Sequence, residues 1–280
     1  YYGSSYPRGR FNGSWSFPNC TSLSMGYAGF TNGFVLYVPK CTSISAGFYD
    51  GIGGEIFVTT AALNRITNSA GPTVRLVNLI VSKYASPTTS AGWRMGTNWY
   101  SQLKSISLED GVTNFEIYDD CLYDVQSKTL LCGPSGKTSV EIKPCTLRIA
   151  SYAFCSETSL TSITGTDSLN VVGDRTFYKC SSLTSFTFPS TLTSLGQYAF
   201  QESGLTSVYI PDVNCVVSIG CFMGCASLVT VRDGTKQVGN NGYRNCTALE
   251  SITYSQVTRL DDAVFNGCSS VSYIYLPATF

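Results

Sequence analysis

A short sequence repeat in the second half of the chain constrains the fold more than any other feature. Six aromatic residues recur at nearly equal intervals: Phe154, Phe177, Phe200, Phe222, Tyr243 and Phe265. A period of about 22 residues with one short strand in each unit is typical of solenoids, in which stacked units bury an apolar face that none could bury alone.

Each unit has two halves around the aromatic residue. The half before it follows I-G-x-x-A-F, in copies at 149–154, 172–177, 195–200, 238–243 and 260–265, and we interpret the Phe222 copy as a shortened "IGCF". The half after it follows C-x-x-L, with the cysteine slot filled by Cys180, Cys225, Cys246 and Cys268. Glu157 and Ser203 stand in that slot in the first and third copies.

The C-x-x-L half leads into a segment in which apolar residues alternate with polar ones. The copies are "LTSFTFP" (183–189), "LTSVYIP" (205–211), "LVTVRDG" (228–234), "LESITYS" (249–255) and "VSYIYLP" (271–277). This period of two indicates strands, and stacked repeats would form a parallel sheet with about 4.8 Å between rungs. We expect one short strand per repeat, with the I-G-x-x-A-F half packed behind the sheet.

Over residues 146–277 the combined pattern, F-x-x-C-x-x-L-x-x-[VI]-x-[IL]-P with I-G-x-x-A-F, closely resembles the BspA-type leucine-rich repeat. That repeat occurs in surface proteins of gut and oral bacteria and in some parasitic protozoa. The resemblance implies surface display and adhesion. It also implies a connector in which Trp99 precedes a closing strand, and a hairpin insertion near 115–145 with its tip at 126–128.

The predicted fold is therefore a β-rich leucine-rich repeat solenoid. We expect an irregular region over 1–145 and regular repeats over 146–280, in one continuous solenoid. Cys20 and Cys41, about one repeat apart, keep the C-x-x-[LI] unit in the divergent half. The chain has no initiator Met, and its last repeat lacks the I-G-x-x-A-F half, so we expect a processed fragment whose parent continues beyond Phe280.

Twelve cysteines divide into two sets. Six occupy the motif slot (Cys20, Cys41, Cys180, Cys225, Cys246 and Cys268), where we expect buried thiols that act as small apolar groups and weak donors to the backbone. Cys121 and Cys132 could form a disulfide across the hairpin. The pairing of these two, and of Cys145, Cys155, Cys215 and Cys221, is left open. A zinc site at "CFMGC" (221–225) lacks the further ligands that zinc needs.

Composition excludes several classes of function. The chain has no histidine, which removes the Ser-His-Asp and Cys-His nucleophile systems and every histidine metal site. A net charge of +0 gives no basic excess for nucleic acid. No apolar run is long enough to span a bilayer. "GPSGKTS" (133–139) lacks P-loop spacing. The acidic pairs at 119–120 and 261–262 would suggest glycosidase carboxylates, but the second pair falls in the turn position of the repeat, which faces solvent. We expect no cofactor and no enzymatic activity.

Function is expected on the residues that flank the central apolar position of each strand. Most are Ser or Thr, but Tyr209, Arg232, Tyr273 and Tyr275 depart from this pattern, and Tyr and Arg are enriched at binding hot spots. We therefore expect an extracellular or cell-surface module that binds a protein or glycan of a host or neighbouring cell through these four residues. The alternative is a structural spacer that projects another domain. A carbohydrate-active enzyme is disfavoured because no convergent pair of carboxylates is apparent.

Overall fold

The computed structural model describes residues 10–11, 13–30, 34–41, 43–48, 55–60, 66–68, 76–86, 103–211, 214–278 and 280. They fall into two compact units, one of residues 1–125 with 133–135 and one of residues 126–132 with 136–280. Within the described ranges no helix is long and apolar enough to cross a membrane. Trp99 and its expected connector lie outside the described residues. The expected domain boundary near residue 145 and the single continuous solenoid stay predictions.

The first unit contains two parallel sheets. One has the order β2 (Ser14–Ser16), β4 (Phe34–Val38), β6 (Glu55–Thr60), β8 (Leu76–Val81) and β9 (Leu103–Leu108), and the other β1 (Arg10–Phe11), β3 (Ser22–Phe30), β5 (Ser43–Phe48) and β7 (Ile66–Asn68). Leu36, Val58, Leu79 and Ile106 pair in register along the first sheet and are all buried. This half is therefore more regular in structure than in sequence, because a parallel ladder needs only alternating inward apolar residues.

The expected hairpin insertion contains two turns. Strands β10 (Phe115–Tyr118) and β11 (Cys121–Asp124) pair antiparallel. Between them Asp119 and Asp120 have φ values of 47° and 59°, as a two-residue turn of the I′ type requires. A second turn at 125–128 then leads from β11 to β12 (Thr129–Cys132), which places 126–128 at a turn as predicted. Cys121 and Cys132 are buried thiols, so the disulfide considered between them is not formed.

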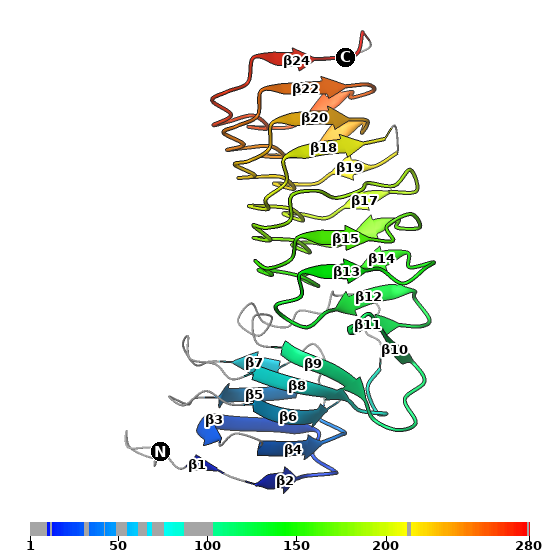
Figure 1. The fold of residues 1–280 in the computed structure, drawn as a ribbon, viewed down its shortest axis with the longest axis vertical. Coiled ribbons are helices and arrows are strands. Elements are labelled where there is room, and N and C mark those ends of the chain that lie inside the picture. Colours follow the sequence, from blue (N-terminus) through cyan, green and yellow to red (C-terminus); the bar gives the residue numbers. More distant parts are fainter. Residues whose placement is uncertain are drawn as a thin grey trace. The chain divides into compact units, whose positions relative to one another are not determined.

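The second unit also contains two kinds of parallel ladder (Figure 1). Strands β13 (Ser139–Glu141) and β15 (Ser162–Thr164) form one pair, and β18 (Ser207–Ile210), β20 (Thr230–Asp233), β22 (Ser251–Tyr254) and β24 (Tyr273–Tyr275) form a four-stranded sheet. On the other side β12 is followed by β14 (Arg148–Ile149), β16 (Val171–Val172), β17 (Ser194–Leu195), β19 (Val216–Val217), β21 (Gln237–Val238) and β23 (Arg259–Leu260). Each regular repeat thus adds a second, two-residue strand at the start of its I-G-x-x-A-F half, which we did not predict.

One predicted strand, 183–189, is not formed. Its apolar residues still alternate inward, and the rings of Phe186 and Phe188 contact the ring of Phe200 at centroid distances of 5.1 and 5.4 Å. The carbonyl of Thr187 accepts a hydrogen bond from the hydroxyl of Thr166 at 2.9 Å. The Thr184 carbonyl also accepts from the Thr206 amide at 3.1 Å, so the segment is held by ring packing and isolated hydrogen bonds rather than by a strand ladder.

The six aromatic residues of the repeat form one stack through the core of the second unit. Successive rings lie 5.1–6.2 Å apart between centroids, with interplanar angles of 1–25°, from Phe154 through Phe177, Phe200, Phe222 and Tyr243 to Phe265. Stacked rings at this spacing contribute beyond their buried area. Recurrence of one aromatic residue per repeat thus produces a continuous apolar column.

The interpretation of the Phe222 copy as shortened is wrong, because the strand register shows a copy of full length. Val217 pairs with Leu195 and with Val238, so the copy runs in full from Val217 to Phe222 as "VSIGCF". Ser218 then takes the glycine position, and Cys221 takes the small-residue position before the ring. Cys221 is fully buried there, which explains a cysteine that the motif had left unassigned.

The turns on either side of each aromatic residue form backbone hydrogen bonds with the equivalent turns of the neighbouring repeat. Two positions in each repeat have positive φ: one at Tyr152, Arg175, Tyr198, Gly220, Asn241 and Ala263 (50–65°), the other at Ser156, Lys179, Glu202, Gly224, Asn245 and Gly267 (56–80°). The amides of Tyr198, Phe200 and Glu202 donate to carbonyl oxygens of the next repeat at 2.8–2.9 Å, and neighbouring repeats do the same. Left-handed residues turn the alternate amides toward the next repeat, which satisfies them without a regular strand.

The cysteine slot forms a second column beside the rings. The thiols donate to the carbonyl oxygen of the aromatic residue one repeat earlier, at 3.0–3.1 Å, in the pairs Cys180–Phe154, Cys225–Phe200, Cys246–Phe222 and Cys268–Tyr243. Ser203 fills the slot in the third copy and lies 3.4 Å from the Cys225 sulfur. Two of the six slot cysteines, Cys20 and Cys268, are only half-buried, which corrects the expectation that all six are buried.

Candidate binding surface

Tyr209, Arg232, Thr253 and Tyr275 form one outward column on the four-stranded sheet of the second unit. The strand register pairs Tyr209 with Arg232, Arg232 with Thr253, and Thr253 with Tyr275. Tyr273 lies in the neighbouring outward column, where it pairs with Ser251. We call Tyr209, Arg232, Thr253, Tyr273 and Tyr275 the Tyr–Arg patch. The structure therefore brings the four predicted site residues onto one face and adds Thr253 between them.

The side chains of the Tyr–Arg patch contact one another in two groups. The Arg232 guanidinium carbon lies 5.3 Å from the centroid of the Tyr209 ring, within the range of a cation–π contact. The rings of Tyr273 and Tyr275 stack at 6.2 Å with an interplanar angle of 19°. The exposed fractions of Tyr209, Tyr273 and Tyr275 are 56, 62 and 57%, so all three rings present much of their surface to solvent.

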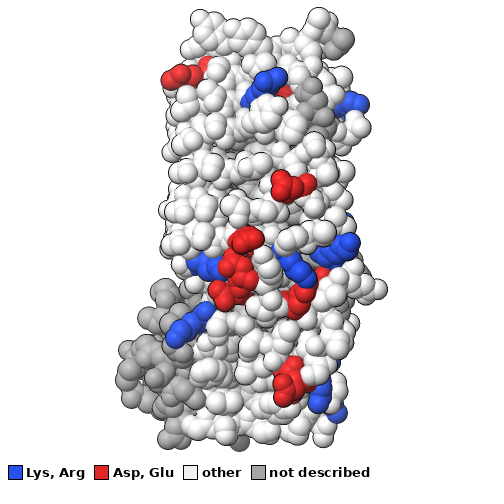
Figure 2. Space-filling model, turned by 45° about the vertical axis from the view of Figure 1, so that its right-hand side comes forward, with Lys and Arg blue, Asp and Glu red and all other residues white. Residues whose placement is uncertain are grey.

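The other outward positions of this face carry small hydroxyl side chains. In the column of Tyr273 these are Ser162, Ser185, Ser207, Thr230 and Ser251, and in the column of Tyr275 they include Thr164 and Thr187. All are exposed or half-buried, as the alternation predicted. Figure 2 shows that charged side chains are few over the C-terminal repeats, in its upper part. On β18, β20, β22 and β24 the Tyr–Arg patch therefore interrupts a surface of small hydroxyl side chains.

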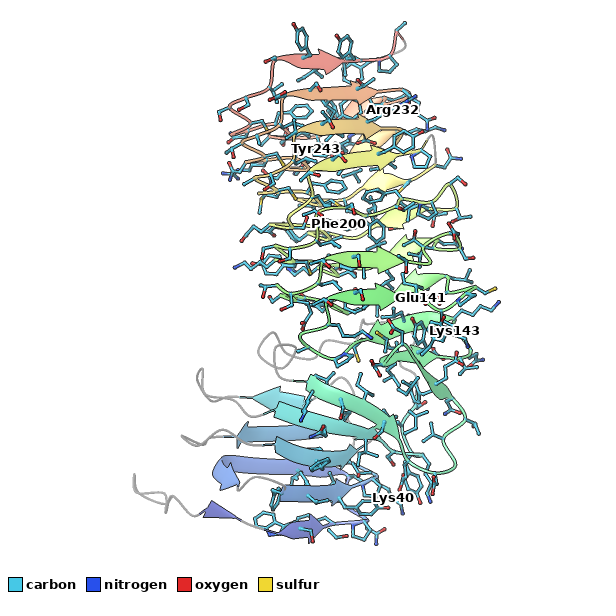
Figure 3. All side chains as sticks on the ribbon, in the orientation of Figure 1. Lys40, Glu141, Lys143, Phe200, Arg232 and Tyr243 are labelled. Atoms are coloured by element: carbon cyan, nitrogen blue, oxygen red, sulfur yellow. The ribbon has the colours of Figure 1, made fainter. Side chains whose placement is uncertain are left out.

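A buried polar cluster lies directly behind the patch. Asp233 follows Arg232 on β20, points inward and is fully buried, where its carboxylate accepts bonds from the Thr235 amide and the Tyr243 hydroxyl, both at 2.9 Å. Figure 3 labels Arg232 and Tyr243 on this part of the solenoid. Burial raises the pKa of Asp233, and the bonds from Thr235 and Tyr243 oppose that shift.

Two residues that depart from the repeat motif thus contact each other. Tyr243 is the one tyrosine among the six stacked aromatic residues, and its hydroxyl meets the one acid on the inward positions of β18, β20 and β22. The next inward residue, Tyr254, is buried with a hydroxyl that has no hydrogen-bond partner among the described residues. We did not predict this cluster, although an acid at an inward strand position was a signal for it.

The rest of the surface offers little for metal chemistry. Within the described ranges no group of three or more His, Cys, Asp or Glu side chains could hold a metal ion. Asp261 lies 2.5 Å from the Arg259 side chain, and Asp262 is an exposed turn residue whose amide bonds to Asn240. Asp262 therefore has the solvent-facing turn role that the sequence indicated, whereas Asp261 is half-buried in its ion pair.

Comparison with known families identifies the repeat. Residues 98–229 and 204–280 match the family described as the BspA type leucine rich repeat region, in six copies. The chain belongs to this family. The expected resemblance is confirmed, and the match extends upstream of the regular repeats to residue 98.

Solved structures show the same fold. A leucine-rich repeat protein from Eubacterium ventriosum is 17% identical over 89% of this chain and 72% of its own, with a TM-score of 0.53. The pneumococcal vaccine antigen PcpA is 14% identical over 86% of this chain and 80% of its own, with a TM-score of 0.52. No curated protein matches the sequence. At these identities the likeness is one of fold.

Proposed function

We propose that this chain is a non-enzymatic binding module of an extracellular or cell-surface protein, and that it holds a protein or glycan of another cell on the Tyr–Arg patch. The observation that carries the proposal is the grouping of three exposed tyrosines and one arginine on a sheet face that is otherwise Ser and Thr. Large rigid side chains with polar tips are the groups that anchor most binding interfaces.

Three further observations support an extracellular setting and a binding role. Charged residues make up only 13% of the chain, and hydroxyl side chains supply the surface polarity instead. The family places the chain among repeat proteins whose stacked strands form extended binding surfaces. One structural relative is described as a vaccine antigen, a description of that protein that fits exposure at a cell surface.

The test is a binding screen of the chain against extracellular-matrix proteins and host glycans. The comparison sample carries Tyr209→Ser, Arg232→Ser and Tyr275→Ser, and its fold is checked by circular dichroism. We expect the native chain to bind at least one partner and the folded triple variant to lose that binding. Equal binding by both would remove the patch from the proposal.

The second candidate is a structural spacer. It is favoured by the remaining outward positions of β15, β18, β20 and β22, which all carry Ser or Thr. A native chain that binds nothing in the screen would favour this spacer over the binding module.

A further inference from the structure

We propose that the ligand of the Tyr–Arg patch is an acidic saccharide, a chain of sugar rings that carries carboxylate or sulfate groups. This inference rests on the proposed function, because it assigns the ligand class of the same surface. Three properties of the patch lead to it: an unopposed positive charge, flat exposed rings at intervals along a ladder, and a surrounding surface of hydroxyl groups.

The charge of the patch is positive and local. Among the described residues Arg232 has no ion-pair partner, and its guanidinium contacts the Tyr209 ring. Asp233, next to it in sequence, points to the opposite side of the sheet and is fully buried. Glu250 lies three residues before Thr253, the rung neighbour of Arg232, which places it about 10 Å away along the strand direction.

A guanidinium in this position suits a planar or multidentate anion. Its fork of N–H donors matches carboxylate and sulfate oxygens in pairs, and it is more weakly hydrated than an ammonium group. The Tyr209 ring holds the guanidinium against one side, so the group is oriented before a ligand arrives. The patch therefore has one built position for an acidic group.

The tyrosines supply positions for sugar rings. A sugar ring presents a face of C–H groups that packs on the flat face of an aromatic side chain, while its hydroxyls remain free to bond elsewhere. Tyr209 and Tyr275 are separated by three rungs of the ladder, about 14 Å at the usual strand spacing. An extended saccharide could thus contact Tyr209, meet Arg232 with its acid and reach the Tyr273–Tyr275 pair.

The surroundings favour a saccharide over a protein partner. The core of a protein–protein interface is dry and apolar, and serine is depleted there. The patch instead adjoins Ser207, Thr230, Ser251 and the included Thr253, whose hydroxyls both donate and accept hydrogen bonds. These groups complement the many hydroxyls of a saccharide, whereas a dry protein interface would leave them without partners.

The experiment measures binding of the chain to three polysaccharides of similar length by calorimetry. Heparin provides sulfate, a polyuronate provides carboxylate, and dextran provides neither. The variants are Arg232→Gln and Tyr209→Ser, with Tyr209→Phe to keep the ring. Arg148→Gln is the matched control, because Arg148 is an exposed arginine on β14 in the opposite ladder of the same unit.

We expect heparin, the polyuronate or both to bind, dextran not to bind, and affinity to fall as salt rises. Arg232→Gln should weaken binding about tenfold or more, since a charge-assisted pair is lost, and Arg148→Gln should change it less than about twofold. Tyr209→Phe should retain most of the affinity that Tyr209→Ser loses.

Four results would overturn the inference. Binding of dextran with the same affinity would show that the charge is irrelevant, and equal losses from Arg148→Gln and Arg232→Gln would show general attraction of cations. If only a protein from the screen binds, and does so through the patch, the proposed function stands and the saccharide is rejected. If neither proteins nor polysaccharides bind, both proposals fail.

Discussion

At the scale of single residues, Asp233 is a carboxyl group that is fully buried in the core of the second unit. Burial raises its pKa above the value in an unfolded chain, so the folded state favours the protonated form. The protonated carboxyl contributes stability that is fully present below the unfolded pKa and is lost as pH rises through the folded pKa.

The first prediction follows from the direction of this pKa shift. Replacing Asp233 with Asn keeps the shape and removes the titration, so the free energy of unfolding of the native chain should fall relative to that of D233N as pH rises from about 4 toward 7. Chemical denaturation of both proteins at a series of pH values measures the difference. A constant difference across this range would show that Asp233 does not titrate as its burial implies.

The second prediction concerns Cys246 and the carbonyl to which it donates. Cys246→Ala removes the thiol donor to the Phe222 carbonyl and leaves a small cavity, so we expect a loss of roughly 1–3 kcal/mol of unfolding free energy. Cys246→Ser restores a donor in a slot that already accepts Ser203, so it should cost less than the alanine variant. Denaturant titration compares the two. An alanine variant as stable as the serine variant would exclude a role for the hydrogen bond.

At the scale of the element, the spacing of successive repeats sets what each turn tolerates. A Cβ added at Gly196 would lie 2.5 Å from the backbone nitrogen of Asp174 in the preceding repeat, closer than real Cβ atoms approach. Backbone atoms cannot move aside without breaking the ladder. Glycine is therefore required at position 196 by close approach to the preceding repeat, not by a left-handed backbone.

The third prediction tests this packing. We expect Gly196→Ala to destabilise the chain by about 2 kcal/mol or more, since overpacking in a tight site costs on this order. Gln197→Ala, the control, changes an exposed neighbour and should stay within about 0.5 kcal/mol of the native value. Thermal unfolding of both variants provides the measurement. A Gly196→Ala variant near native stability would show that the turn accepts any small residue.

At the scale of the whole molecule, the reactivity of the twelve cysteines reports on whether the chain is folded. Nine are buried thiols, Cys20 and Cys268 are half-buried, and Cys145 is exposed. Burial raises the pKa of Cys215 to about 12 and that of Cys221 well above its ordinary value. Hydrogen bonds to Cys225 and Cys268, together with burial, raise the pKa of Cys246. Protonated buried thiols are poor nucleophiles.

The fourth prediction is a reactivity pattern. With a disulfide thiol reagent at pH 8, exposed Cys145 and half-buried Cys20 and Cys268 should react in the native protein, and the nine buried cysteines only after denaturant unfolds the chain. Absorbance of the released thiolate counts the reactive groups, and peptide mapping assigns them. Rapid reaction of Cys225 or Cys246 in the native protein would contradict the buried column.

The sequence alone determined the parts of the structure that repeat. One aromatic residue and one cysteine slot in every repeat predict a ring stack and a thiol column, because stacked units place equivalent residues above one another. The alternation in each strand likewise predicted which face carries Tyr209, Arg232, Tyr273 and Tyr275. These inferences need only local periodicity, which is visible in the sequence itself.

Tertiary structure alone decided the features that depend on contacts between repeats. The strand register restored the full Phe222 copy, and inter-repeat backbone bonds explain the left-handed residues such as Tyr198. The match of Asp233 with Tyr243 joins two residues that each look like an isolated exception in sequence. The physical reason is that a solenoid is stabilised by contacts between units, so each residue packs against neighbours one repeat away. A sequence motif shows which positions recur, but it does not show which residues of different positions contact one another.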